Sequence, residues 1–198
     1  LLEKAGDALV RGATELCIQG GIHPAKDHNH YRDILLAMKR EFPEIHLHAF
    51  SPEEIDFGHR KSGMELSDYL RWLMDAGLGT IPGTAAEILD DSVRAIVSPR
   101  KLKTARWVEI VKAAHSVGLR STSTLMYGHI ETVEQVAAHL DETAPGGAKR
   151  SARVFLMTDA QPNVGATTAG AFKPMMQGAA ARGARPTSSL AATSPRTS

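Results

Sequence analysis

The chain has 198 residues, 42% of them hydrophobic and 23% charged, a composition typical of a soluble globular protein with a sizeable core. Its net charge of +1 gives no support for nucleic-acid or membrane-surface binding, and no apolar run reaches the roughly 18 residues of a membrane span. The single cysteine, Cys17, excludes an internal disulfide and a cysteine-cluster metal site built by this chain alone. It suits the reducing cytoplasm, where we expect the protein.

Residues 14–24 predict a strand that runs into a glycine turn. Residues 16–18 form the apolar run expected of a parallel strand covered on both faces, which would bury Cys17 as an inert thiol. Gly20 and Gly21 permit positive φ and let a ligand approach the backbone. Ligands of parallel α/β folds bind at the carboxyl ends of strands, so this turn is a candidate site. A plain connection to the next helix explains the glycines equally well.

The rest of the chain to residue 141 alternates between helical and strand patterns. Apolar spacing predicts helices within 1–11, 31–42, 66–74, 85–97, 107–117 and 133–140, and strands at 45–50, 78–81 and 120–126. Residues 51–63 are expected to be a turn and a charged loop. Four strand–helix alternations about 30 residues apart indicate parallel βαβ units, and the lack of a phosphate loop favours a barrel over an open sheet.

Residues 143–198 differ in character from the residues before them. They are net basic whereas residues 1–142 are net acidic, and Ala, Gly, Pro, Ser and Thr dominate them. Such a composition buries too little apolar surface to offset chain entropy. We therefore expect a folded domain at 1–142 and a disordered or artefactual tail at 143–198. Because the chain starts at Leu1 without an initiator Met, we also expect it to be cut from something longer.

Polar residues gather after each predicted strand. The groups are Gln19 to His23, His48 to Glu53, Thr80 to Glu87, and Ser123 to Glu131. Because the carboxyl ends of parallel strands meet at one edge, these four groups are expected to line a common pocket, as at the mouth of a barrel.

His46 and His48 offer a rival interpretation. Two residues apart in a strand, they lie on the same face, which is a spacing found in metal-dependent hydrolases. Such a site needs further His or Asp ligands from later strands, and His129 is the one late candidate. A metal-dependent TIM-barrel hydrolase therefore stays open as an alternative.

Five segments together resemble FO synthase, a radical SAM enzyme: residues 15–24, 48–53, 77–90, 101–107 and 123–129. The similarity is to its tyrosine-using half, the CofH subunit or the C-terminal half of the fused FbiC protein, and it covers about residues 1–141. The futalosine-pathway enzymes of menaquinone synthesis share the Gln-Gly-Gly and Tyr-Gly-His segments. The Gly-Thr-Ile-Pro-Gly-Thr run at 79–84 favours FO synthase over them.

The resemblance implies an α/β fold, a partial (β/α) TIM-type barrel of the radical SAM kind with four strands present and its first and last parts missing. In that family a 4Fe-4S cluster held by a CxxxCxxC loop cleaves S-adenosyl-L-methionine (SAM). The radical formed transfers the 4-hydroxybenzyl group of L-tyrosine to 5-amino-6-(D-ribitylamino)uracil on the way to a deazaflavin coenzyme. A CofG-type half, fused or separate, is the implied protein partner.

The chain departs from the family pattern because it has no CxxxCxxC loop, so no residue is expected to bind metal. It is expected to be inactive alone, as a fragment or a truncated product. No residue is assigned a catalytic role. By position, the resemblance assigns Gln19, Gly20, Gly21, Ser51, Glu53 and Glu87 to cofactor binding, and His23, His48, Thr84, Tyr127 and His129 to substrate binding.

Overall fold

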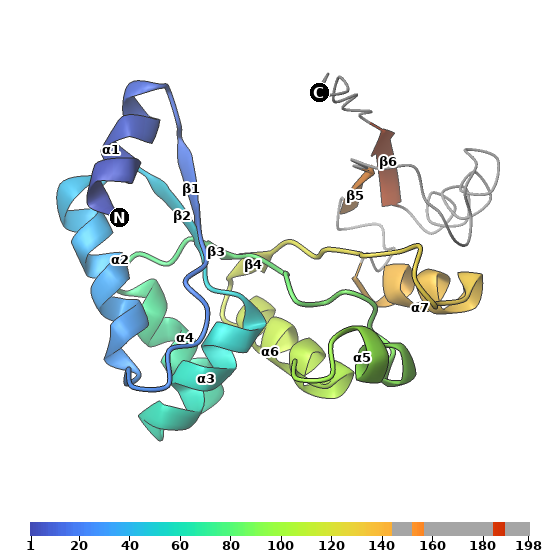
Figure 1. Cartoon of the computed structure of the whole chain (residues 1–198). Coiled ribbons are helices and arrows are strands. Elements are labelled where there is room, and N and C mark those ends of the chain that lie inside the picture. The colour runs from blue at the N-terminus through green and yellow to red at the C-terminus, as the bar shows by residue number, and fades with distance from the viewer. Residues whose placement is uncertain (144–151, 157–183, 189–198) are drawn as a thin grey trace, which may run out of the picture. The chain divides into compact units, whose positions relative to one another are not determined.

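The computed structural model describes residues 1–143, 152–156 and 184–188 (Figure 1). In chain order the elements are α1 (Leu2–Val10), β1 (Glu15–Ile18), α2 (Asn29–Glu41), β2 (His46–Ala49), α3 (Pro52–Ser62), α4 (Leu66–Met74), β3 (Thr80–Ile81), α5 (Asp91–Val97), α6 (Thr104–Ser116), β4 (Arg120–Ser121), α7 (Val133–Thr143), β5 (Ala152–Leu156) and β6 (Ala184–Ser188). They form two compact units. The first comprises residues 1–86 and 100–124, and the second comprises residues 87–99 and the described residues after 124.

The first unit contains a parallel sheet of four strands in the order β1-β2-β3-β4. Glu15 of β1 pairs with His46 of β2, and Thr80 of β3 pairs with Arg120 of β4. At least one helix separates each strand from the next, which is the connectivity that brings the carboxyl ends of parallel strands to one edge. The predicted α/β class with four parallel strands is confirmed.

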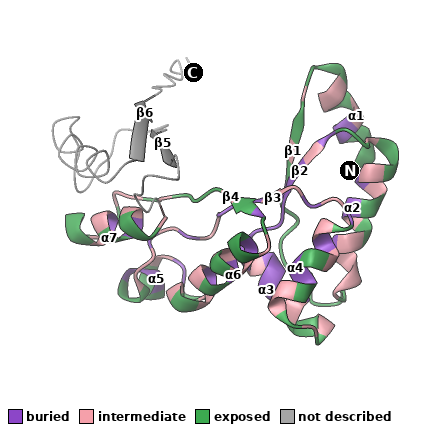
Figure 2. Ribbon diagram, turned by 180° about the vertical axis from the view of Figure 1, so that it is seen from behind, coloured by how far each residue is buried: buried purple, intermediate pink, exposed green. Residues whose placement is uncertain are grey.

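One face of this sheet is apolar and the other is polar. Leu47, Ala49 and Ile81 are fully buried and join the core supplied by α2, α3, α4 and α6, which pack on one another as neighbours (Figure 2). Cys17 is exposed, so its predicted burial is wrong. Successive strand side chains point to opposite faces, and Ile18 takes the core side in β1. The apolar run therefore covers one face of the sheet, and the thiol lies on the other.

Residues 52–62 form a helix, α3, where the sequence predicted a turn and a charged loop. Ser51 and Glu54 make a reciprocal capping box, Pro52 occupies the first turn, and the helix ends at Gly63 with φ 69°. Each of these is a known helix-boundary signal. The high charge of the segment concealed a helix whose start and end are both encoded in the sequence.

The helix predicted over 85–97 is too long, because only α5 forms there. Asp90 caps α5 by accepting a hydrogen bond from Ser92 N at 2.9 Å. Before this cap, Ala85 and Glu87 have φ values of 62° and 49°, which a right-handed helix does not allow. The third and fourth strands are also shorter than predicted.

The second unit holds α5 and α7 around a small apolar cluster that includes Val93 and Val136. Thr132 N donates to Gln135 Oε1 at 2.8 Å and Gln135 N to Thr132 Oγ1 at 3.3 Å, a capping box before α7. Strands β5 and β6 pair in parallel. Apart from these two strands and residue 143, the predicted tail lies outside the described residues, so the division at residue 142 stays a prediction.

Across the described ranges, no helix combines the length and the apolar character that crossing a membrane requires.

Candidate functional site

The polar face of the sheet carries a hydrogen-bonded row of side chains that begins on β2 and ends just after β4. His46 Nε2 and His48 Nδ1 lie 2.8 and 2.7 Å from Thr80 Oγ1. His48 Nε2 lies 3.4 Å from Thr122 Oγ1, which accepts a hydrogen bond from Gly83 N. Because Thr80 has one hydroxyl hydrogen, it can donate to one imidazole while accepting from the other. The tautomers of the two histidines are therefore coupled.

His48 is the buried member of this row, with 9% of its surface exposed. Desolvation by burial lowers the pKa of His48; the nearby Glu15 carboxylate opposes this shift, and His46 reinforces it. A neutral imidazole offers one donor and one acceptor, which suits recognition of an uncharged polar group. Gly79 is required beside the row, because a Cβ there would lie 2.4 Å from the His46 ring.

The turn after β1 is held by Glu54 of α3, a residue that the sequence analysis did not select. Its Oε1 accepts hydrogen bonds from Gly20 N at 2.8 Å and from Gly21 N at 2.9 Å. Its Oε2 accepts from Ser51 N and Ser51 Oγ, both at 2.8 Å. The carboxylate thereby ties the end of β1 to the end of β2. The Ser-x-x-Glu capping pattern at Ser51 is the sequence signal that could have identified it.

The ends of β1 and β3 are joined as well. Thr84 Oγ1 donates to Gln19 Oε1 at 3.1 Å, and Trp107 Nε1 donates to the Thr84 carbonyl at 3.2 Å. In the first unit the structure thus connects the predicted cofactor residues after β1 to Ser51 through Glu54, and to the predicted substrate residue Thr84 directly. Their functional roles stay predictions.

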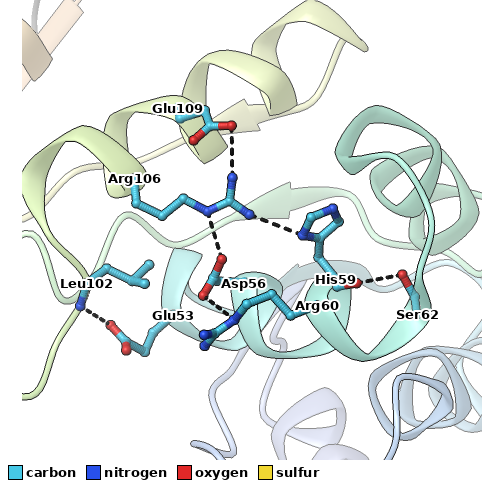
Figure 3. A network of polar contacts seen from close by, with 8 residues as sticks. All are labelled: Glu53, Asp56, His59, Arg60, Ser62, Leu102, Arg106 and Glu109. Atoms are coloured by element: carbon cyan, nitrogen blue, oxygen red, sulfur yellow. Dashed lines mark hydrogen bonds and ion pairs between the residues drawn. The ribbon is translucent and has the colours of Figure 1, made fainter.

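Glu53 and His23, which also lie in the first unit, have other contacts. Glu53 Oε2 accepts a hydrogen bond from Leu102 N at 3.0 Å, so one carboxylate oxygen fixes the segment before α6 (Figure 3). His23 is exposed, and its carbonyl accepts a hydrogen bond from Lys26 N. No contact of either residue tests the role that the sequence predicted for it.

Glu87, Tyr127 and His129 belong to the second unit. Glu131 fills the turn that contains His129, accepting hydrogen bonds from the backbone N–H groups of residues 128–130, two of them at 3.1 Å. Burial acts to raise the pKa of Glu131, but these backbone donors outweigh burial and lower the pKa. That the three predicted residues share one pocket with those of the first unit stays a prediction.

The residues that the structure describes do not provide the ligands for a metal cluster. They contain no group of three His, Cys, Asp or Glu side chains placed to hold a metal ion. A 4Fe-4S cluster is held by several thiolates, and Cys17 is the one cysteine in the sequence. The two histidines proposed as hydrolase ligands, His46 and His48, both bond Thr80 instead.

Comparisons with known proteins place the chain in a family. The model of the radical SAM superfamily matches residues 1–143. The 5-amino-6-(D-ribitylamino)uracil--L-tyrosine 4-hydroxyphenyl transferase of Nostoc punctiforme is 52% identical over 147 residues, covering 72% of this chain and 39% of that protein. The transferase of the same name from Methanothermobacter thermautotrophicus is 50% identical over 141 residues, covering 71% and 38%.

FO synthase of Mycobacterium tuberculosis is 52% identical over 139 residues, which cover 70% of this chain and 16% of that protein. The chain therefore spans about two fifths of the length of the transferases that it matches, and less of FO synthase. The matched residues include the whole parallel sheet and the helices between its strands. The resemblance found in the sequence is confirmed, and the chain belongs to the radical SAM superfamily.

Proposed function

We propose that the chain is part of a radical SAM transferase that acts on L-tyrosine and 5-amino-6-(D-ribitylamino)uracil, as the names of its relatives state for those proteins. The observation that carries the proposal is an identity of about half over some 70% of the chain, together with the family match over residues 1–143, which include every strand of the parallel sheet. A CofG-type half, fused or separate, is the protein partner that we propose. The free thiol of Cys17 suits the reducing cytoplasm.

The barrel architecture belongs to this proposal. The sheet order β1-β2-β3-β4 follows the order of the strands in the chain. A (β/α) barrel adds its strands in chain order, whereas a doubly wound sheet reverses direction at a switch point. The four strands therefore support a partial barrel whose polar inner face carries His48 and Thr80.

SAM would bind against the turn after β1. The peptide bonds are trans, so the carbonyls of Gln19 and Gly20 point away from the N–H groups of Gly20 and Gly21, which face Glu54. Two carbonyl oxygens at a strand end accept hydrogen bonds well from an ammonium group such as that of methionine. In this superfamily SAM supplies a 5′-deoxyadenosyl radical. This chain's contribution is to hold and orient the cofactor.

The polar row would bind the substrates. His48 is buried, its pKa is lowered by desolvation, and it is held between the hydroxyls of Thr80 and Thr122. His48 Nδ1 bonds Thr80, so Nε2, whose contact with Thr122 is long at 3.4 Å, is the nitrogen that a phenol hydroxyl or a uracil ring would bond instead; both groups combine donor and acceptor atoms. Because cluster thiolates would have to come from polypeptide beyond these 198 residues, we expect the chain alone to bind SAM without cleaving it.

Calorimetric titration of the 198-residue chain with SAM tests the proposal. We expect saturable binding at one site, and L-tyrosine is expected to bind to the chain with SAM already present. The same titration with zinc tests the hydrolase alternative. Tight stoichiometric zinc binding with no SAM binding would contradict the proposal.

A further inference from the structure

We propose that Glu54 is a positioning residue for SAM, which holds the turn after β1 in the orientation that presents the Gln19 and Gly20 carbonyls to the methionine end of the cofactor. This inference rests on the proposed function and deepens it. It adds a residue to which the resemblance assigned no role.

Glu54 acts through the turn rather than by touching the ligand. Its two oxygens accept four hydrogen bonds, from Gly20 N, Gly21 N, Ser51 N and Ser51 Oγ. A carboxylate has about four acceptor sites, so no site is left for a bound ammonium group. The side chain is also buried, with 2% of its surface exposed.

The two glycines do not fix the turn by themselves. Gly20 and Gly21 are exposed, Gly21 has φ 70°, and a Cβ on Gly21 would find no heavy atom within 4 Å. Two consecutive exposed glycines adopt many conformations unless hydrogen bonds select one. The carboxylate of Glu54 supplies two such bonds, and it belongs to α3, a helix anchored in the core.

Tyr31 of α2 provides a further contact with the same turn. Its hydroxyl donates to the Gly21 carbonyl at 3.3 Å. Burial, with a smaller effect of the Glu54 charge, raises the pKa of Tyr31 to about 12, so the phenol stays protonated and remains a donor at neutral pH. This bond occupies one of the two lone pairs of the Gly21 carbonyl, so the carbonyls of Gln19 and Gly20 are the more open acceptors for a ligand.

Two ligands that share a nucleoside distinguish positioning from general structural support. SAM carries the methionine ammonium group, whereas 5′-methylthioadenosine has the same nucleoside and sulfur without the amino-acid end. We expect Glu54→Gln to raise the Kd for SAM about tenfold and to leave the Kd for 5′-methylthioadenosine within about twofold. The amide cannot replace all four bonds, because one of its atoms donates where an oxygen accepted.

Asp56→Asn is the matched control. Asp56 is a buried carboxylate of the same helix that contacts Arg60 and Arg106 and does not touch the turn. This variant is expected to lose stability while binding both ligands as the unchanged chain does. Calorimetry of the full chain and its two variants gives all six dissociation constants.

The inference is overturned if Glu54→Gln weakens the binding of both ligands equally or of neither. It is also overturned if Asp56→Asn weakens the binding of SAM to the same extent. Failure of the proposed function looks different. In that case the unchanged chain would bind neither SAM nor 5′-methylthioadenosine, and the role of Glu54 would fall with it.

Discussion

Glu54 and Glu131 each accept hydrogen bonds from successive backbone N–H groups of a glycine-containing turn. Concave arrangements of successive N–H groups bind anions, and a glycine turn in a sequence invites that interpretation. In both turns of this chain an internal carboxylate already fills the anion position. The faces left for a ligand are therefore the carbonyl faces, which favour ammonium and other donor groups.

The titration of His48 gives a prediction at the scale of one residue. Burial lowers its pKa, with Glu15 opposing the shift and His46 adding to it, so the unfolded chain takes up a proton at a higher pH than the folded one. The stability that neutral His48 contributes is complete above the unfolded pKa of about 6.5 and is lost as pH falls toward the folded pKa.

NMR titration of the imidazole resonances checks this expectation directly. The midpoint for His48 is expected below 6.5, and His48→Gln should remove the corresponding fall in unfolding free energy at acid pH. His115, exposed at the end of α6, serves as the matched histidine for a His115→Gln control. A midpoint for His48 at or above that value would show that burial does not govern its protonation.

At the scale of elements, a buried carboxylate joins α3 to α6. Asp56, whose side chain is 3% exposed, accepts from Arg60 Nε at 2.9 Å and from Arg106 Nε at 2.7 Å (Figure 3). Arg106 also contacts His59 Nδ1 at 3.1 Å and Glu109 Oε1 at 2.8 Å. The ion pair between the two helices is thus largely shielded from water, whereas Arg60 is 67% exposed.

Removing this carboxylate is expected to be costly. Asp56→Ala should lower the free energy of unfolding by about 3 kcal/mol, because it leaves the partly buried Arg106 without its charged partner on α3. Arg60→Ala removes only the exposed partner and should cost under about 1 kcal/mol. Urea unfolding of both variants measures the difference. Equal losses of unfolding free energy in the two variants would show that the ion pair between Asp56 and Arg106 contributes no more to stability than the exposed pair with Arg60.

Replacing two glycines by alanine is expected to change the stability of the fold in opposite directions. A Cβ at Gly83 would lie 1.8 Å from the Thr122 carbonyl oxygen, a backbone atom that cannot move aside. We expect Gly83→Ala to destabilise the fold by about 3 kcal/mol. Gly6 lies within α1, where a Cβ would meet only Phe42 at 3.8 Å, so Gly6→Ala should stabilise by roughly 0.5 to 1 kcal/mol. Thermal unfolding measures both changes in stability. A Gly83→Ala variant as stable as the unchanged chain would contradict the close approach of Gly83 to Thr122 at the strand ends.

Apolar periodicity predicted most elements because it depends on local spacing, as in α2 and α4. The helix α3 was missed although its capping box is local, because its charge outweighed that signal. The positive φ at Ala85 and Glu87 has no local signal, since alanine and glutamate ordinarily avoid that conformation.

The candidate site was predicted in part. Contact between Gln19 and Thr84 follows from strand-end reasoning over a separation of 65 residues. Selecting Glu53 instead of Glu54 shows the limit of that reasoning. Which of two adjacent glutamates points at the turn depends on the rotational phase of α3, which requires the helix to be recognised first.

For the whole molecule, the chemistry of the metal cluster gives a further prediction. Anaerobic reconstitution with iron and sulfide is expected to leave this chain without a stable 4Fe-4S cluster, because one cysteine cannot supply the thiolates. Iron analysis and visible absorbance after desalting measure the outcome. Stoichiometric retention of four irons per chain would contradict the account.

The proposed function makes the polar face of the parallel sheet the ligand-binding face of the molecule. Cys17 lies on that face and pairs in register with His48. Because it is the single thiol of the chain, its alkylation measures access to that face alone. The most direct measurement is the rate at which iodoacetamide alkylates Cys17, with and without SAM and L-tyrosine at concentrations that calorimetry shows to be saturating. We expect the bound ligands to slow alkylation severalfold, and an unchanged rate at saturation would show that they do not bind on this face.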